Sequence, residues 1–134
     1  PLRRSRYCLH HDNEDQVHEM IIAFCRDTYV RPHKHLQKSE SFHVIEGELA
    51  VVFFDDSGNQ VDRLKMGSIE QGGTFIYRLA SDMWHTVIAL ADSVIIHETT
   101  CGPFIKDESI FPSWAPKDGD EEGIKKFISA LGII

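Results

Sequence analysis

Two histidines and a glutamate lie at short, regular offsets in the first half of the chain. His33 and His35 are two residues apart, and Glu40 follows five residues after His35. Alternate residues of a β-strand point to the same face, so a strand over this segment presents both imidazoles side by side. A short turn returns the chain antiparallel, and Glu40, near the start of the next strand, can add a carboxylate. His43 faces away from Glu40 by the same alternation, so we expect it outside this group.

A fourth ligand must come from elsewhere in the chain, and we predict His85. It follows an expected turn at Ser81-Asp82 and opens an apolar strand. Three imidazoles and one carboxylate suit a borderline divalent ion, namely Fe(II), Mn, Ni, Co or Zn, rather than Ca or Mg. On a six-coordinate ion, four protein ligands leave two positions for water or substrate, as in catalytic rather than structural sites. We therefore expect one divalent transition-metal ion as cofactor.

Five further side chains are candidates for lining a ligand site: Phe42, Tyr77, Arg78, His97 and Glu98. Tyr77 and Arg78 are adjacent on the strand that leads toward His85, so only one of them can point inward. Arg78, if inside, is a good anion clamp. His97 and Glu98 end a later strand and either line the mouth or have a plain structural role. Phe42 is expected to contribute to barrel packing.

The elements that must position these residues are short strands separated by turns. Strand-like runs cover residues 17–26, 28–30, 40–45, 48–54, 61–66, 74–79, 84–90 and 93–99. The run from Asp55 to Asn59 is a strong hairpin signal. Spacing of this kind is typical of a β-sandwich or β-barrel. Since no connection has room for a crossover helix, the sequence predicts an antiparallel, all-β fold.

The end of the chain changes character. Residues 111–116 read as an extended segment lying across the barrel. Apolar residues then recur at helical spacing, at Ile124, Phe127, Ile128 and Leu131. Acidic residues precede this stripe, where a helix dipole favours negative charge. We therefore divide the chain into an N-terminal arm at 1–16, a barrel at 17–104, and an extended segment and helix packing on the barrel at 105–134.

Composition limits the partners. The chain has 134 residues, which suits one domain, and a formal net charge of -7. Nucleic acids and anionic membranes are polyanions, so neither is an expected partner. No apolar run has the length of a membrane span, and residues 1–4 lead into a polar segment with no signal-peptide core. We expect a cytoplasmic protein whose three cysteines (Cys8, Cys25 and Cys101) are reduced, small apolar core residues.

The spacing of His33, His35, Glu40 and Gly47 resembles the first motif of the cupin superfamily. The second cupin motif is poorly kept, because only His85 matches at its expected place, with Thr74, Ala80, Asp82 and Ala89 at the other positions. The resemblance implies a cupin-type jelly roll, similar to RmlC, that binds a metal. Cupin barrels commonly pair through exposed strands, which implies a homodimer.

A closer resemblance spans nearly the whole chain. The matching residues are Arg3, Arg4, Arg6, the segments 9–11, 29–35, 54–58, 84–86, 102–104 and 114–116, and Glu98. They are similar to the WbuC family of cupin-fold metalloproteins, which is associated with bacterial O-antigen and surface-polysaccharide loci. The association implies a small-molecule partner such as a sugar or sugar nucleotide, with the reaction left undefined.

Three functions follow as hypotheses. The first is a metal-dependent sugar isomerase or epimerase, in which the metal polarises a carbonyl or hydroxyl pair. An Fe(II)-dependent dioxygenase is a second, and a non-catalytic, metal-dependent binding module is a third. His10 and His11, with the nearby arginines, either grip an anionic substrate such as a sugar phosphate or belong to a solvated, partly ordered N-terminus.

Overall fold

Ten short strands and one helix make up the part of the fold that the structure describes. A computed structural model describes residues 3–80 and 82–133. The strands are β1 (Arg4–Cys8), β2 (Val17–Cys25), β3 (Lys34–His35), β4 (Glu40–Glu46), β5 (Glu48–Phe54), β6 (Gln60–Gly67), β7 (Ile76–Leu79), β8 (Trp84–Ala89), β9 (Ser93–Cys101) and β10 (Ser109–Ile110). Two 3-10 turns lie at Ile69–Gln71 and Lys106–Glu108, and helix α1 covers Glu121–Ala130.

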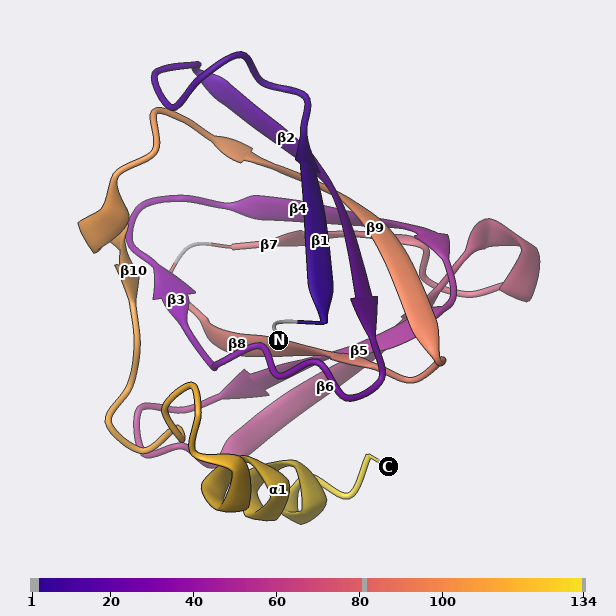
Figure 1. Ribbon diagram of the computed structural model, residues 1–134, viewed down its shortest axis with the longest axis vertical. Helices are drawn as coiled ribbons and strands as arrows, with labels where there is room; N and C mark the ends of the chain where they lie inside the picture. Colours follow the sequence, from indigo (N-terminus) through magenta and orange to yellow (C-terminus); the bar gives the residue numbers. More distant parts are fainter. Residues whose placement is uncertain (1–2, 81, 134) are drawn as a thin grey trace.

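The strands form two main sheets that curl around a common interior (Figure 1). One sheet has five strands in the order β1-β2-β9-β4-β7, and the other has three in the order β6-β5-β8. Strands β3 and β10 form a small third sheet. Every strand pairing is antiparallel, so the predicted antiparallel all-β fold with a short C-terminal helix is confirmed.

Strand β5 contributes to two hydrophobic clusters, which explains why its sequence is apolar throughout. Leu49, Val51 and Phe53 point into the main core between the two large sheets. Ala50, Val52 and Phe54 point the other way, into a second cluster beneath α1. A strand covered on both faces needs no polar alternation, and almost every residue of β5 is buried.

Helix α1 covers the outer face of the three-stranded sheet (Figure 1). Three residues of the predicted stripe, Phe127, Ile128 and Leu131, pack against Phe54 and its neighbours, whereas Ile124 is not part of that cluster. Asp120 caps the helix by accepting a hydrogen bond from the Gly123 N–H. Glu121 and Glu122 lie in the first turn, where the sequence predicted acidic residues. Trp114 packs in the same cluster, so it has a structural role.

Residues 28–30, predicted as a strand, are irregular instead. The β-branched and aromatic composition gave the strand signal, but the segment is held by contacts with the chain's end. Tyr29 donates its hydroxyl hydrogen to the Pro116 carbonyl at 2.9 Å, and Arg31 Nη2 donates to the Pro112 carbonyl at 3.2 Å. Tertiary contacts outweigh local β-propensity here.

The N-terminal arm predicted at residues 1–16 contains a strand. Residues Arg4–Cys8 pair with β2 along its length, which makes β1 the edge of the five-stranded sheet. Every residue of β1 is exposed. Because neither face of the strand is buried, its sequence does not alternate between apolar and polar residues. Backbone hydrogen bonds to β2 hold the strand in place, and the pattern of side chains in the sequence does not predict them.

Two other features complete the fold. The turn predicted at Ser81-Asp82 lies partly outside the described residues, and Asp82 has a positive φ of 63°. All three cysteines are free thiols, but Cys8 and Cys101 are exposed rather than in the core as expected, because they lie on an edge strand and at a strand end. Within 3–80 and 82–133, no helix combines the length and hydrophobicity needed to cross a membrane.

Candidate metal centre

His33 and His85 face each other across an antiparallel bridge. The backbone N–H of each donates to the carbonyl of the other, at 3.0 Å from His33 and 2.9 Å from His85. Side chains of two directly opposed residues lie on the same face of a sheet. The bridge thus places the two imidazoles together, with ring centroids 4.5 Å apart, although the residues are far apart in sequence.

His35 and Glu40 come from either side of one turn. His35 ends β3, two residues after His33, and Gln37 in the turn takes a positive φ of 59°. Glu40 starts β4 between its neighbours Thr100 of β9 and Leu79 of β7. Because β4 is an interior strand, the Glu40 side chain is only 5% exposed and points into the barrel.

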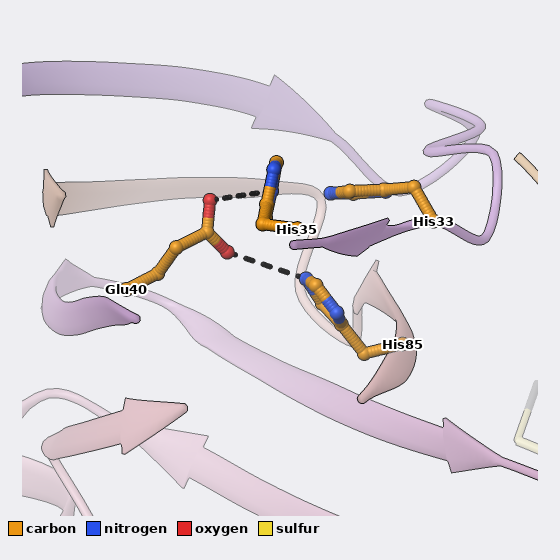
Figure 2. Close-up of side chains that lie close together, drawn as sticks. All are labelled: His33, His35, Glu40 and His85. Carbon is orange, nitrogen blue, oxygen red and sulfur yellow. Dashed lines mark ion pairs between the residues drawn. The ribbon is translucent and has the colours of Figure 1, made fainter. Parts of the chain in front are cut away.

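The donor atoms of these four residues converge. His35 Nε2 lies 2.8 Å from Glu40 Oε1, and His85 Nε2 lies 3.3 Å from Glu40 Oε2 (Figure 2). One ligand atom from each of the four residues lies within 4.8 Å of all the others. Donors about 2.1 Å from a shared ion would be separated by roughly 3 to 4 Å, so the cluster is close to the size of a metal site.

Each imidazole is oriented by a hydrogen bond on its far nitrogen. His33 Nδ1 lies 2.8 Å from the Arg31 carbonyl and His85 Nδ1 lies 3.0 Å from the Met83 carbonyl. A carbonyl only accepts, so both Nδ1 atoms carry the hydrogen and both Nε2 atoms keep a lone pair. His35 Nδ1 lies 2.8 Å from Ser109 Oγ, which orients the third ring and can donate to Nδ1 or accept from it. This arrangement is the outer-shell support typical of metal-ligating histidines.

His35 Nε2 makes the strongest case that the cluster suits a cation. The atom is buried and lies 2.8 Å from Glu40 Oε1, yet no hydrogen bond joins it to any residue of the described chain. A buried polar atom without a partner is unfavourable unless something else satisfies it. A divalent ion held by Nε2 and the carboxylate oxygen would satisfy both.

The electrostatics of His33 and Glu40 favour metal binding. Burial and, to a lesser extent, the neighbouring His85 lower the pKa of His33 to about 4. Burial alone would raise the pKa of Glu40, but its contacts with His35 and His85 outweigh that effect and hold it well below the usual range. His33 is therefore neutral and Glu40 ionised, the forms that bind a metal.

A cavity of about 500 Å³ opens beside the cluster. All four cluster residues line it, and apolar side chains such as Phe42, Val87 and Ile96 form much of its remaining wall. Concave, mostly apolar sites of this size commonly bind small molecules. The end of the chain closes one side, where Ser109 and Phe111 also line the cavity.

The other predicted lining residues divide into two groups. Phe42 and Glu98 pair directly across β4 and β9 and both line the cavity. Glu98 is half-buried, and burial, together with repulsion from Glu40, raises the pKa of its carboxyl to about 7. A carboxyl with this pKa can both take up and release a proton near neutral pH.

Tyr77, Arg78 and His97 are not part of the cavity wall. Tyr77 is the inward-facing member of its pair and packs on the main core. Arg78 is exposed and donates to Ser39 Oγ, so it is not the anion clamp. His97 faces outward, with Nε2 3.3 Å from Glu19 Oε1. His43, on the same outer face, contacts Phe75 and is absent from the cluster, as predicted.

Sequence reasoning missed the residues that the end of the chain brings to the cavity. Strand β10 pairs Ser109 with His35, and Lys38 forms an ion pair with Glu108. No periodic pattern marks this segment. The two-residue strand Ser109–Ile110 is too short to show alternation, so only the tertiary structure reveals it.

The sequence was also compared with known proteins. Residues 1–66 match the profile of a domain of unknown function, DUF6016. No curated protein matches the sequence. Several solved structures share the architecture, and three of them show its range.

The capsular polysaccharide assembling protein CapF from Staphylococcus aureus matches with a TM-score of 0.69 and 14% identity, over 82% of this chain and 32% of CapF. The cupin domain of Cnp3 from Schizosaccharomyces pombe matches with a TM-score of 0.57 and 12% identity, over 75% of this chain and 66% of that domain. Recombinant oxalate oxidase in complex with glycolate matches with a TM-score of 0.60 and 16% identity, over 83% of this chain and 56% of the oxidase.

The chain has the cupin fold. At these identities the similarity establishes the cupin fold alone. The chain also spans about a third of the length of CapF, 32%. This fold agrees with the His33, His35, Glu40 and Gly47 spacing, which in this structure places the first three side chains in the cavity and Gly47 in the turn between β4 and β5.

Proposed function

We propose that this cupin holds one divalent transition metal through His33, His35, Glu40 and His85 and uses it to bind a small molecule in the adjoining cavity. The convergence of four donor atoms from separate strands on one point carries the proposal. When bound, such an ion would act as a Lewis acid toward a ligand oxygen. Fe, Mn, Ni, Co and Zn all suit this donor set.

Elemental analysis of protein purified without chelator tests the proposal. We expect about one metal ion per chain, and loss of most of it in His33→Ala. His43→Ala is the matched control, because His43 lies on the outer face and contacts Phe75 rather than the cluster. Equal metal content in the two variants, or no metal in the wild type after reconstitution, would contradict the proposal.

The ligand we propose is a sugar or sugar nucleotide of bacterial O-antigen or surface-polysaccharide biosynthesis. The resemblance to the WbuC family supports it, as does the fold shared with CapF, itself described as assembling capsular polysaccharide. A cavity of about 500 Å³ is also large enough for a monosaccharide derivative. A thermal-shift screen of nucleotide sugars, sugar phosphates and neutral sugars tests this, since a ligand that binds the folded state raises the melting temperature, and a tighter ligand raises it more.

The reaction we favour is isomerisation or epimerisation, with Glu98 moving the proton. Glu98 lines the same cavity as the cluster without belonging to it. Its raised pKa suits proton transfer near neutrality. Such an enzyme should exchange solvent deuterium into carbon-bound positions of its sugar, and Glu98→Gln should abolish the exchange.

Two alternatives give different results in the same assays. An Fe(II)-dependent dioxygenase is supported by the three-histidine, one-glutamate donor set and by the fold shared with oxalate oxidase. It would consume oxygen and bind nitric oxide at the metal. A binding module without turnover would show neither exchange nor oxygen consumption, yet its melting temperature would still rise with ligand.

We also propose a cytoplasmic homodimer. Strands β6 and β7 are sheet edges and expose apolar side chains, with Val61 59% and Ile76 57% exposed. Unpaired edges of this kind favour association with a second chain. Sedimentation equilibrium measures the mass, and a monomer at micromolar concentration would contradict the dimer.

A further inference from the structure

Two arginines of the edge strand β1 are directed toward the cavity. Arg4 pairs with Phe24 and Arg6 pairs with Ile22 across β1 and β2. Directly opposed residues share a face of the sheet, and Phe24 and Ile22 are buried core residues. Both arginines accordingly line the cavity that holds the histidine cluster. Arg3 has the opposite parity and forms an ion pair with Asp27.

The other two cations of the cavity wall already have partners. Lys38 forms an ion pair with Glu108 and donates to the Pro103 carbonyl at 2.7 Å. Arg31 donates to the Pro112 carbonyl and lies over the Phe111 ring at 4.9 Å. In contrast, neither Arg4 nor Arg6 forms a side-chain hydrogen bond or ion pair with any residue in 3–80 or 82–133. Their guanidinium donors remain available.

The acidic groups of the cavity do not neutralise this pair. Glu40 is engaged by His35 and His85, and Glu108 by Lys38. Among the cavity carboxyls of the sheet, Glu98 lies nearest to β1, since it pairs with Met20 and Met20 pairs with Cys8. Asp118, the remaining carboxyl of the lining, is exposed, lies in the segment before α1 and acts on Tyr29. At the β1 end of the wall one carboxyl, Glu98, faces two guanidinium groups, so the surroundings of Arg4 and Arg6 keep positive charge although the whole chain carries a net charge of -7. A local positive site in an acidic protein selects anions.

We propose that Arg4 and Arg6 form a phosphate-binding subsite, holding the phosphate of a small ligand whose other end reaches the metal position beside Glu40. This inference rests on the proposed function for the role of the metal. Two guanidinium groups offer ten N–H donors, more than the two oxygens of a carboxylate can accept and better suited to a phosphate. Strand β1 is three strands from β4, roughly 14 Å along the curved sheet at about 4.8 Å per step. A ligand the size of a sugar phosphate, together with the long arginine side chains, spans this distance.

Calorimetric titration of Zn(II)-loaded protein with glycolate, malonate and 2-phosphoglycolate tests the subsite. All three probes can bind a metal through a carboxylate, and only the last carries a phosphate. We expect 2-phosphoglycolate to bind at least about tenfold more tightly than glycolate or malonate. In the double variant Arg4→Gln/Arg6→Gln this preference should fall to about one, with glycolate affinity unchanged.

Arg3→Gln is the matched control and should keep the full preference, because Arg3 pairs with Asp27 away from the cavity. Unchanged melting temperatures would show that both variants fold. A preference that survives in the double variant means that phosphate binds the metal directly, which overturns the subsite. No preference in the wild type also overturns it. Malonate binding as tightly as 2-phosphoglycolate overturns the choice of phosphate.

Failure of the metal site gives a separate result. If the protein takes up no zinc, the proposed function is wrong, and inorganic phosphate titrated into metal-free protein then tests the arginines alone. The subsite requires phosphate binding at low ionic strength that weakens at least about tenfold in the double variant. Equal binding by the wild type and the double variant overturns it.

Discussion

His33 and His85 are joined through their backbones, each N–H donating to the other's carbonyl. The two side chains therefore stay on one face of the sheet whatever they bind. The pairing does not depend on either imidazole, so the strand geometry should survive substitution of a single ring. This separates the role of the side chains in binding from the role of the backbone in folding.

The first prediction concerns His85→Ala. Removing one of four ligands should weaken zinc binding by more than the ~10–100-fold that loss of an outer-shell partner causes. The fold should persist, because the His33–His85 bridge uses backbone atoms. Competition with a chromogenic chelator measures the affinity, and far-ultraviolet circular dichroism reports the fold. Zinc affinity equal to that of the wild type would exclude His85 as a ligand.

The second prediction concerns Ser109, whose hydroxyl lies 2.8 Å from His35 Nδ1. Ser109→Ala removes the group that orients this ring and should weaken metal affinity about 10-fold or more. Ser113→Ala is the control, because Ser113 is exposed and belongs to the same segment. The same chelator competition applies, and equal affinities in the two variants would show that Ser109 does not support the site.

The third prediction separates two carboxyls of one cavity wall. Glu40→Gln should lower the bound metal well below one per chain, because the amide is a weaker ligand than the carboxylate. Glu98→Gln should leave the metal content unchanged, since Glu98 is outside the cluster. Elemental analysis of both proteins measures the bound metal per chain and so distinguishes a ligand from a residue outside the ligand set. Metal loss in Glu98→Gln would place that residue in the ligand set.

The fourth prediction concerns Gly47, which turns the chain between β4 and β5 with a φ of 82°. A Cβ there would lie 2.5 Å from the Ser93 carbonyl oxygen. Gly47→Ala should therefore destabilise the fold by about 3 kcal/mol or more, through backbone strain and steric clash together. Gly72 also has a positive φ, 67°, but open space around it, so Gly72→Ala should lose only about 1 kcal/mol. Urea unfolding compares them, and equal losses would refute the clash.

The fifth prediction concerns stability at high pH. Burial raises the pKa of Tyr29 above its usual value of 10, and its hydroxyl donates to the Pro116 carbonyl. A group with a raised pKa in the folded state stabilises fully below its unfolded pKa, and that contribution is lost as the pH rises above it. Tyr29→Phe should lose about 1 kcal/mol at neutral pH. It should also show less alkaline destabilisation than the wild type above pH ~10. Urea unfolding at several pH values measures both effects, and parallel pH profiles would contradict the assignment.

The sequence alone determined the features that depend on neighbouring residues. The spacing of His33, His35 and Glu40 predicted a shared face because strand alternation and a short turn act over a few residues. The apolar strands and the helix stripe at Phe127, Ile128 and Leu131 predicted an all-β fold with a terminal helix, since burial imposes a period on the sequence. His85 was predicted from its strand position and the Trp-His-Thr context.

The tertiary structure alone decided the features that depend on chain pairing. Strand β1 is fully exposed and β10 has two residues, so neither bears a burial pattern, and their place in the fold is set by backbone pairing with β2 and β3. These two strands bring Arg4, Arg6 and Ser109 to the cavity. Sequence alternation limited Tyr77 and Arg78 to one inward residue, and the register of β7 against β4 selected Tyr77. The periodicity of apolar side chains in a sequence reflects which face of an element is buried. Backbone pairing between distant segments produces no such periodicity, so the sequence does not predict it.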